Sequence, residues 1–576
     1  MTQIKIPYGI SNFEVLVRED FHYVDKTHYI ETLEKLGDKL IIFLRPRRFG
    51  KSLFVSVLSY YYDLYYKEKF TSIFQKYYIG KNPTSLKNTY AILKFDFSGI
   101  LTETVKDSQE GFLTSVYLSI DVFIAWYFPE WDKEKVEKIL KPKQAYLILK
   151  QLFGALKKEK NAPPVYVLID EYDHFTNELL SFDLDAFKNA VSKNGWVRKF
   201  YETLKIATSE GIVDRIFITG VSPVTLDGLT SGFNILKHKS TNASLNEMMG
   251  FKKDEVAEIL LGVGVTEEKL PRVMKDLKLW YDGYLFSTEA NTMMYNSDMV
   301  LYFAYNYAEN GKYPRNMLDI NIMSDYSKIR KQFRIGGRES ENIVILDDLL
   351  RENNVYSDLT EQFTFEKNFD RRDFMSLIYY NGLITIRGLK GSKINFKIPN
   401  YVIKRLYFDY FRQTLMEKAQ ITGDALGYEF ALDDLLFDNN IKPLIKVVND
   451  LLKRLSNRDS IQFDEKHLKM IFATILSSSD ALFFHSEYET NRGFVDIFWE
   501  KTVRFTDVPF QFIFEFKYIS KTERKTMSEA NYEVFLTNAK NQLLTYKQTP
   551  YFQDLADLKA YLIVYSGEVD DFVGEV

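Results

Sequence analysis

The chain of 576 residues contains no cysteine, and it is also poor in proline (14 residues) and glycine (27 residues). The absence of cysteine excludes disulfide bonds and thiolate metal sites, and it fits a reducing compartment. The scarcity of proline and glycine predicts few long, irregular loops. No apolar run approaches the roughly 18 residues of a membrane-spanning helix, and residues 1–7 lack the apolar core of a signal peptide. We therefore expect a cytoplasmic protein without a membrane span.

Histidine and excess positive charge are scarce as well. The six histidines include no His-x-x-x-His pair, which argues against a catalytic zinc site. A formal net charge of −4 and a pI near 6.1 exclude a globally basic nucleic-acid-binding protein, although a local basic groove is compatible with these values. At about 150 residues per domain, the length predicts three or four domains.

One candidate phosphate site lies near the start of the chain. Residues 39–44 include a short apolar run typical of a buried parallel strand, and a helical stretch follows from residue 53. The loop between them reads Arg-Pro-Arg-Arg-Phe-Gly-Lys-Ser, which is the setting of a P-loop. Main-chain N–H groups near Gly50 would cradle phosphate oxygens, Lys51 would reach the β- and γ-phosphates, and Ser52 would ligate Mg²⁺.

An arginine, Arg45, stands where the usual loop has its first glycine. With Arg47 and Arg48 it makes the predicted loop stiffer and more basic, and these last two residues are further candidates for nucleotide binding. The alternative for this segment alone is a glycine-containing turn at the basic start of a helix.

A second apolar run, at residues 164–169, ends in Asp170 and Glu171. This is a Walker B pattern, in which Asp170 would hold the Mg²⁺ shell and Glu171 would activate the attacking water. A further strand ends in Thr219, a candidate sensor of the γ-phosphate. The alternative is a buried strand with a helix cap, but the two motifs in this order favour a nucleotide-binding fold.

The last fifth of the chain carries a different pattern of acidic residues. Asp496 lies in an apolar stretch at residues 494–499, and Glu515 and Lys517 lie in another at residues 510–519, so both stretches predict strands. Side chains at i and i+2 share one face of a strand, so Glu515 and Lys517 should point together toward Asp496 on the paired strand. Two carboxylates can hold Mg²⁺, which activates a bound water, and Lys517 can stabilise developing charge. The alternative is a set of ordinary strand residues with a cross-strand ion pair.

Two helical segments flank these strands. Residues 463–476 predict a helix with Glu465 near its start, and Gln542 and Tyr546 lie one turn apart on a second predicted helix. An acid on a helix, Asp, Glu-x-Lys and Gln-x-x-x-Tyr, in this order, resemble the PD-(D/E)XK nuclease superfamily over roughly residues 440–576.

The resemblance implies a catalytic site made of Glu465, Asp496, Glu515 and Lys517, with the metal on Asp496 and Glu515. It also implies that Gln542 and Tyr546 support this site or touch DNA. Many relatives have a basic residue after the glycine of the Gly-x-x-Asp element, where this chain has Phe494.

The N-terminal half resembles the bacterial AAA-ATPase-like family. The resemblance is carried by Ile-Pro-Tyr-Gly-Ile-Ser-Asn-Phe at 6–13, Phe-His-Tyr-Val-Asp-Lys-Thr at 21–27, the loop at 45–52, Ile-Asp-Glu-Tyr-Asp at 169–173, Thr-Gly-Val-Ser-Pro at 219–223 and Trp-Tyr-Asp-Gly-Tyr-Leu-Phe at 280–286. Members commonly join this ATPase to a C-terminal PD-(D/E)XK-like domain, and an arginine at the first glycine of the loop is normal among them. The resemblance implies ATP and Mg²⁺ as cofactors.

The predicted fold is α/β in three parts. A P-loop NTPase parallel sheet with helices is expected at residues 1–285, a helical lid with a winged-helix-like segment at 286–439, and an α/β PD-(D/E)XK-type nuclease fold at 440–576. The winged-helix expectation comes from a helix, a turn and two strands at residues 374–398, with a further helix from residue 400. Lys390, Lys393 and Lys397 are candidate DNA contacts in this module, and the alternative is a structural lid with solvated lysines.

The leading hypothesis is a protein that binds and hydrolyses ATP and couples this to Mg²⁺-dependent hydrolysis of phosphodiester bonds in nucleic acid, with DNA as the expected substrate. The rival is a nucleotide-dependent switch or interaction protein, whose nuclease-like domain binds DNA or a partner without cutting. Assembly into a homo-oligomer is left open, and no membrane partner is expected.

Overall fold

A computed structural model describes residues 4–182, 184–191, 195–223, 235–319, 321–322, 333, 339–361, 363, 369–421, 427–456, 464–479, 481–502, 507–555 and 557–576. The chain divides into two compact units, Met1–Tyr401 and Val402–Val576. The predicted three-part division has its boundaries elsewhere, at residues 285/286 and 439/440, and it stays a prediction. Among the helices of the described residues, none is long and apolar enough to cross a membrane.

The first unit is built on a five-stranded parallel sheet with the strand order β2-β3-β4-β1-β5. Its strands are β1 (Leu40–Leu44), β2 (Ala91–Asp96), β3 (Val165–Asp170), β4 (Val213–Gly220) and β5 (Lys237–His238). β3 is buried along its whole length and β1 along all but its first residue, as strands covered on both faces require. The predicted parallel sheet is confirmed.

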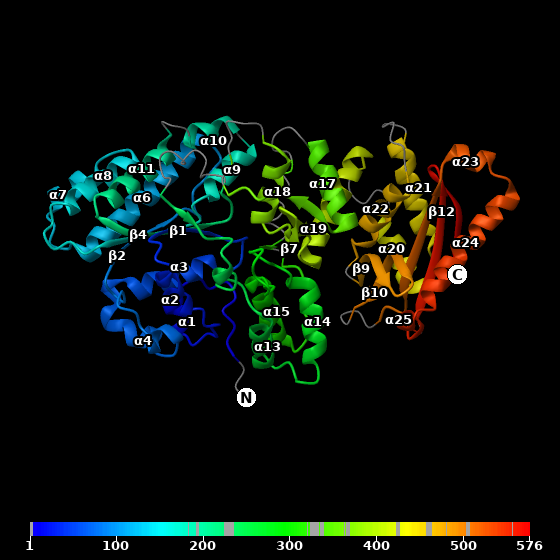
Figure 1. Cartoon of the computed structure of the whole chain (residues 1–576), viewed down its shortest axis with the longest axis horizontal. Coiled ribbons are helices and arrows are strands. Elements are labelled where there is room, and N and C mark those ends of the chain that lie inside the picture. Colours follow the sequence, from blue (N-terminus) through cyan, green and yellow to red (C-terminus); the bar gives the residue numbers. More distant parts are fainter. Residues whose placement is uncertain are drawn as a thin grey trace. The chain divides into compact units, whose positions relative to one another are not determined.

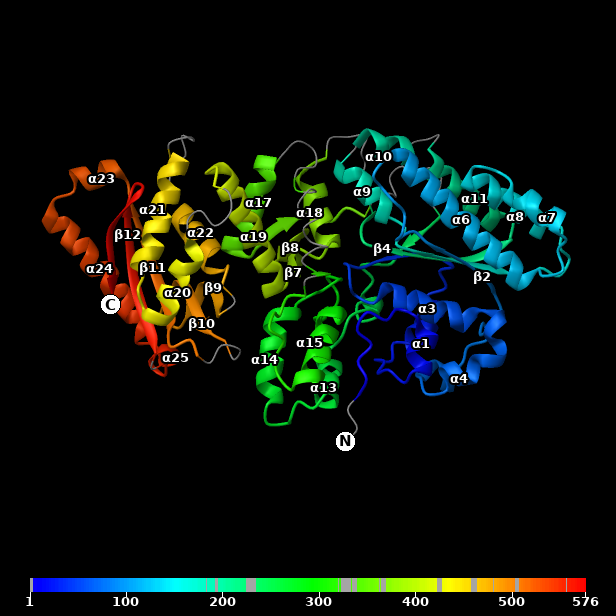
Figure 2. The same cartoon turned by 180° about the vertical axis from the view of Figure 1, so that it is seen from behind.

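Helices cover both faces of this sheet. One group, near the N-terminus, contains α1 (Phe13–Arg18), α2 (His28–Lys35), α3 (Lys51–Tyr62), α4 (Phe70–Phe74) and α5 (Tyr78–Lys81). The other contains α6 (Val105–Tyr127), α7 (Lys133–Leu140), α8 (Ala145–Leu156), α9 (His174–Phe182), α10 (Leu184–Val191) and α11 (Trp196–Ser209). Figures 1 and 2 show α3 on one face of the sheet and α6, α8 and α11 on the other.

The carboxyl ends of β1, β2, β3 and β4 lie at the same end of the sheet. Leu44, the last residue of β1, pairs with Gly220 of β4, and Asp96 of β2 pairs with Asp170 of β3. Because the strands are parallel, the segments that follow β1, β3 and β4 lie together at the carboxyl end of the sheet. Open α/β sheets bind their ligands at this end.

Arg45, at the start of the loop after β1, is an interior residue. Its guanidinium lies between the rings of Phe43 and Phe286, 4.1 and 4.0 Å from their centroids. It also donates to the main-chain oxygens of Ser240 and Leu245 at 2.7 and 3.0 Å. Burial lowers the pKa of Arg45 to about 9. Arg45 therefore stiffens the loop, as the sequence indicates, but its charge faces the protein interior and not the loop surface.

Three helices follow the sheet in the chain: α13 (Lys253–Gly262), α14 (Leu270–Tyr281) and α15 (Ser297–Asn310). The Trp-Tyr-Asp-Gly-Tyr motif spans the end of α14, where Trp280 packs edge to face on Tyr401 with centroids 4.8 Å apart. Gly283 in this motif has φ 104° and lies so close to Pro399 that a Cβ there would be 2.2 Å from the Pro399 oxygen. The motif is thus a tight packing point inside the first unit.

A small module with a three-stranded antiparallel sheet completes the first unit. It contains α17 (Glu339–Glu352), β6 (Val355–Ser357), α18 (Arg371–Tyr380), β7 (Thr385–Lys390) and β8 (Lys393–Lys397), with the strand order β6-β8-β7. α18, β7 and β8 have the order expected of the winged-helix-like segment.

The three lysines of this module engage the module itself. Lys393 pairs with Asp358, and the Lys390 ammonium lies 5.0 Å from the centroid of the Tyr356 ring. Burial lowers the pKa of Lys397. A DNA contact by these lysines stays a prediction.

The second unit contains a five-stranded mixed sheet with the order β13-β12-β11-β10-β9. Its strands are β9 (Leu482–Thr490), β10 (Gly493–Lys501), β11 (Gln511–Ile519), β12 (Leu558–Ser566) and β13 (Val569–Glu575). β11 and β12 are parallel, and the other neighbours are antiparallel. Its helices are α20 (Tyr428–Asp438), α21 (Lys442–Ser456), α22 (Glu465–Leu476), α23 (Lys521–Thr526), α24 (Glu529–Lys547) and α25 (Pro550–Gln553), and α19 (Tyr401–Lys418) begins at the boundary between the units.

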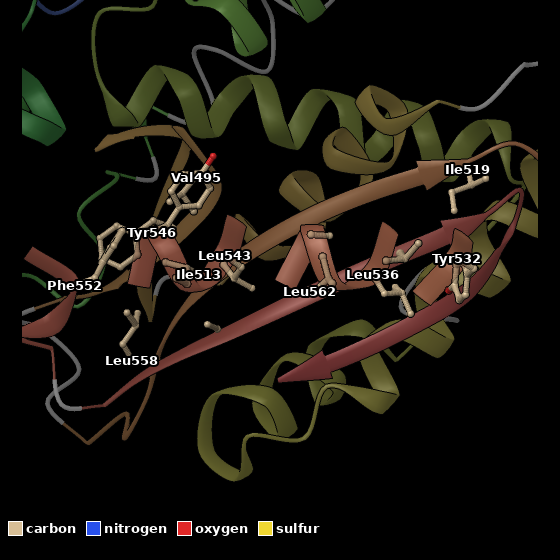
Figure 3. Packing of buried hydrophobic residues seen from close by; sticks show 14 residues of the cluster. Val495, Ile513, Ile519, Tyr532, Leu536, Leu543, Tyr546, Phe552, Leu558 and Leu562 are labelled. Atoms are coloured by element: carbon tan, nitrogen blue, oxygen red, sulfur yellow. The ribbon is translucent and has the colours of Figure 1, made fainter. Parts of the chain in front are cut away.

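A buried cluster joins α24 to the sheet of the second unit. Leu536 and Leu543 of α24 pack with Ile513 of β11 and Leu562 of β12 (Figure 3). α22 also packs on β11, because Phe472 lies with its ring centroid 4.8 Å from that of Phe516. Residues of β11 alternate between faces, so helices held by Ile513 and by Phe516 cover the sheet from both sides.

We predict that Gly283→Ala destabilises the first unit more than Gly264→Ala does. Gly264 has a similar positive φ of 95°, but its Cβ position has no atom within 4 Å. Both substitutions should cost about 1–2 kcal/mol for the left-handed conformation, and Gly283→Ala should add about 1–3 kcal/mol for the overlap with Pro399. Calorimetric unfolding of the full chain measures the difference, and equal shifts of the two variants would contradict the close approach.

A second prediction concerns His238 of β5. Burial, and then the charge of Arg45, lowers the pKa of His238 from 6.5 to about 4. The ring of Tyr380 lies beside it, with centroids 6.1 Å apart. As the pH falls from 6.5 toward 4, His238 therefore becomes protonated in the unfolded chain but stays neutral in the folded chain. Folding stability should fall by up to about 3 kcal/mol over that window.

His238→Gln should remove this component, so its unfolding temperature should drop less than that of the wild type between pH 7 and pH 4.5. His467→Gln is the matched control, since His467 is half-exposed in the second unit. Parallel pH profiles for the wild type and His238→Gln would show that His238 does not carry the effect.

Candidate functional sites

The loop between β1 and α3 turns through two left-handed residues, Arg48 with φ 67° and Gly50 with φ 85°. Gly50 is the N-cap of α3, and glycine adopts this conformation without strain. Lys51, the first residue of the helix, is buried; its ammonium donates to the main-chain oxygen of Pro46 at 3.2 Å and lies 3.6 Å from a carboxylate oxygen of Glu171. The helix start, with its main-chain N–H groups, thus has the ammonium of Lys51 beside it.

Asp170 at the end of β3 lies next to this helix start. The Ser52 hydroxyl is near enough to lower the pKa of the Asp170 carboxyl, so the two residues predicted to share a Mg²⁺ ion are neighbours. Burial, and then the charge of Glu171, raises the pKa of Asp170 to about 6. Glu171 itself has φ 50°, a strained conformation for a residue with a side chain. Such strain gathers at functional sites.

Thr219 and Asp173 lie beneath the end of β4. Thr219 is fully buried, and within the described ranges its hydroxyl has no hydrogen-bond partner. Asp173, to which the sequence assigned no role, accepts hydrogen bonds from the main-chain N–H groups of Val221 and Ser222 at 3.0 and 2.7 Å and from Asn177 at 2.6 Å. Asp173 therefore fastens the turn after β3 to the turn after β4.

A cavity of about 360 Å³ opens in front of the loop. Of the predicted residues it is lined by Arg48, Gly50, Lys51, Ser52 and Glu171, whereas Arg47, Asp170 and Thr219 are not part of its lining. Its other walls come from residues 9–11, 22–24, 248–251 and 297–298, which lie far apart in the sequence.

Sequence reasoning assigned no ligand contact to these other walls. The signal that was present is the Ile-Pro-Tyr-Gly-Ile-Ser motif at 6–11, which forms part of the lining. Across the cavity, Arg48 pairs with Asp298 at 2.9 Å, which closes the loop onto the start of α15.

The second candidate site lies where β10 and β11 separate. Their ladder runs from the Trp499–Phe512 pair to the Ile497–Phe514 pair and stops before Asp496. The Asp496 carboxylate accepts the main-chain N–H of Phe516 at 2.8 Å instead. Asp496 therefore bridges the two strands at their fork.

Glu515 and Lys517 point to the same side of β11, as the i and i+2 spacing predicts. The Lys517 ammonium lies 2.8 Å from Oε1 of Glu515, whose side chain is 1% exposed. Burial, and then the charge of Asp496, raises the pKa of Glu515 to about 7. The other carboxylate oxygen of Glu515, Oε2, is buried and has no hydrogen-bond partner within the described residues. A buried oxygen of this kind suits a hard cation, so the pair of Glu515 and Asp496 fits a metal.

Lys469, which sequence reasoning missed, lies among the remaining carboxylates. Its ammonium is 2.5 Å from Oδ1 of Asp496, 3.1 Å from Glu465 and 3.8 Å from Glu487. Burial opposes its charge, but the attraction of Asp496 and Glu465 raises the pKa of Lys469 well above its usual value. The available signal was its spacing, one helical turn after Glu465. Within the part of the chain that the structure describes, no three His, Asp or Glu side chains are arranged to hold a metal ion.

Gln542 and Tyr546 form a pair on α24. The Gln542 amide donates to the Tyr546 hydroxyl at 2.9 Å. The Tyr546 ring packs over Gly493, whose φ is 127° and whose Cβ position is 3.2 Å from the phenol. The pair thus holds the start of β10, three residues before Asp496.

Comparison with known proteins supports both domain resemblances. Residues 7–230 match the family model described as predicted AAA-ATPase, and residues 463–572 match the PD-(D/E)XK nuclease superfamily. A protein of Azotobacter chroococcum mcd 1, named as an uncharacterized protein in the vnfD 5′ region, is 26% identical over 311 residues, which is 53% of this chain and 52% of that relative. The chain thus matches about half of the length of this relative. The solved structure of a Walker-type ATPase of Pyrococcus abyssi aligns with a TM-score of 0.38 and 13% identity, covering 70% of this chain and 98% of that one.

Both resemblances drawn from the sequence are confirmed. The chain joins a domain of the predicted AAA-ATPase family at residues 7–230 to a domain of the PD-(D/E)XK nuclease superfamily at residues 463–572.

Proposed function

We propose that this protein hydrolyses ATP in its first unit and uses Mg²⁺ to hydrolyse phosphodiester bonds of DNA in its second. The observation that carries the proposal is the buried Oε2 of Glu515, which is next to Asp496 and lacks a partner among the described residues. A buried carboxylate oxygen left open in this way costs free energy unless a ligand satisfies it.

In the first unit, Lys51 and the main-chain N–H groups after Gly50 bind the phosphates, with Arg47 and Arg48 as neighbouring cations. Ser52 and Asp170 hold the Mg²⁺ that accompanies ATP. Glu171 accepts a proton from the attacking water.

Thr219 is the proposed sensor of the γ-phosphate. Because its side chain is fully buried at the end of β4, Thr219 acts from the protein interior.

In the second unit, Asp496 and Glu515 hold the catalytic Mg²⁺. When bound, this ion lowers the pKa of a water molecule and neutralises phosphate charge. Lys517 orients Glu515 through its 2.8 Å contact and stabilises charge that develops on the phosphate. Glu465 acts at the same site, and Gln542 and Tyr546 support β10 beneath it.

The proposed setting is the cytoplasm, with nucleic acid as the partner. The chain has no excess of basic residues, so DNA binding rests on a local surface and not on net charge. A homo-oligomer is compatible with an AAA-type ATPase.

A second function has an observation of its own. Lys469 neutralises Asp496 and its neighbours without any metal, so the second unit can be a stable binding module. In that case the protein is a nucleotide-dependent switch whose nuclease-like domain binds DNA or a partner without cutting.

We predict that two variants separate ATP binding from ATP hydrolysis. Lys51→Ala should weaken ATP binding by about 10–100-fold, because it removes charge-assisted hydrogen bonds to phosphate. Glu171→Gln should leave binding near the wild-type level and slow hydrolysis by about 10²–10⁴-fold, because it removes the proton acceptor. Titration with a fluorescent ATP analogue and release of inorganic phosphate measure the two steps.

Lys150→Ala is the matched control for Lys51→Ala, since Lys150 is exposed on α8 and away from the cavity lining. Hydrolysis at the wild-type rate by Glu171→Gln would remove Glu171 from its proposed role. Unchanged ATP binding by Lys51→Ala would mean that Lys51 does not bind the phosphates as proposed.

DNA cleavage is the direct test of the second site. Asp496→Asn and Glu515→Gln should each lower cleavage of linear or circular DNA in Mg²⁺ by about 10³-fold, because each weakens a metal ligand worth several kcal/mol to the transition state. Glu533→Gln, an exposed residue of α24, should cut as the wild type does.

The same assay with and without ATP, repeated on Lys51→Ala, tests whether the two activities are coupled. If ATP is hydrolysed while DNA stays intact in Mg²⁺ and Mn²⁺, the nuclease proposal is wrong and the switch takes its place.

A further inference from the structure

The side chain of Lys469 fills a position that is bounded by carboxylates from three different elements. Glu465 comes from α22, Glu487 from β9 and Asp496 from β10, and their oxygens lie 3.1, 3.8 and 2.5 Å from the ammonium. An ammonium has three N–H donors; Asp496 and Glu465 lie within hydrogen-bond distance of it, whereas Glu487 contributes charge from 3.8 Å. The ammonium of Lys469 is therefore a positive charge that is attached to the chain and surrounded by three carboxylates.

The backbone on both sides holds this position in place. Lys469 and Glu465 are one turn apart on α22, so they share one helical face. The β9–β10 ladder skips one pair, in which Glu487 lies opposite Asp496. Glu487 also has a strained φ of 51°. A non-glycine residue keeps such a conformation only where the surrounding structure imposes it.

The two oxygens of Asp496 face different partners. Oδ1 contacts Lys469, whereas Oδ2 accepts the N–H of Phe516. Glu515 is similarly divided, with Oε1 on Lys517 and Oε2 buried without a partner among the described residues. The ammonium of Lys469 thus occupies one position of the site. At the other, Oε2 of Glu515 has no hydrogen-bond partner among the described residues.

We propose that Lys469 takes the place of a second divalent cation, so that the second unit binds one metal ion, at Glu515 and Asp496, and not two. The inference rests on the proposed metal-dependent function of this unit. Glu465 and Glu487 then serve to hold Lys469, and they act on the metal through the lysine. A second ion could bind only if the ammonium of Lys469 moved away from Asp496. The hydrogen bonds of the lysine would then be lost, and two divalent ions would lie close together.

The number of bound ions tests this inference without reference to activity. The full chain is titrated with Mn²⁺ in the absence of nucleotide, and free Mn²⁺ is followed by electron paramagnetic resonance. Asp170→Asn is present in every sample so that the ATP site does not add to the count. The protein with Lys469 should bind one Mn²⁺, and Lys469→Ala should bind two.

Lys466→Ala is the matched control, because Lys466 is exposed on the same helix, and it should bind one ion. Adding Glu515→Gln to the protein with Lys469 should remove its single ion. Circular dichroism and thermal unfolding verify that each variant is folded. The count for the protein with Lys469 needs no substitution at position 469, so the test stands even if Lys469→Ala does not fold.

Each other result overturns the inference in a distinguishable way. Two ions in the protein with Lys469 would mean that the lysine is displaced, which leaves the proposed nuclease function standing. One ion both with and without Lys469 would mean that the position does not accept a metal. No ion in either protein would overturn the proposed metal site together with this inference.

Discussion

The ion pair between Lys469 and Asp496, with 2.5 Å between nitrogen and oxygen, illustrates the constraint on which both units depend. A carboxylate placed in a protein interior is costly unless positive charge or hydrogen bonds compensate it. Asp496 and Glu515 are almost completely buried at the strand fork of the second unit, and Lys469 and Lys517 supply the compensation there.

The first unit meets the same constraint with fewer contacts. Asp170 is buried at the end of β3, with the Ser52 hydroxyl and the charge of Lys51 nearby. Burial raises the pKa of Asp170 in spite of these neighbours, so a cation bound beside it would favour its charged form. Both units therefore have buried carboxylates with the charge of a lysine nearby.

Rigid surroundings hold these charged groups in position. Arg45 ties the start of the phosphate loop to the interior through two aromatic rings and two carbonyl oxygens. Asp173 fastens the turns after β3 and β4 to each other. In the second unit, Tyr546 packs over Gly493 and holds the strand that carries Asp496. Preorganisation of this kind is what a site needs when charge develops during a reaction.

The sequence by itself determined the parts of this protein that depend on local order. The apolar runs and the residues directly after them predicted β1, β3, β10 and β11, and the i and i+2 spacing predicted that Glu515 and Lys517 share one side of a strand. The order of the motifs along the chain was enough to identify both families.

Only the tertiary structure decided which distant side chains meet. Lys469 reads as an ordinary helical lysine until Glu487 and Asp496 are brought beside it by the sheet. Arg45 reads as a basic loop residue, but Phe286, far along the chain, takes it into the interior. Periodicity and spacing report neighbours within a helix or strand, whereas the charge balance of a buried group is set by contacts across the fold, and these leave no local pattern in the sequence.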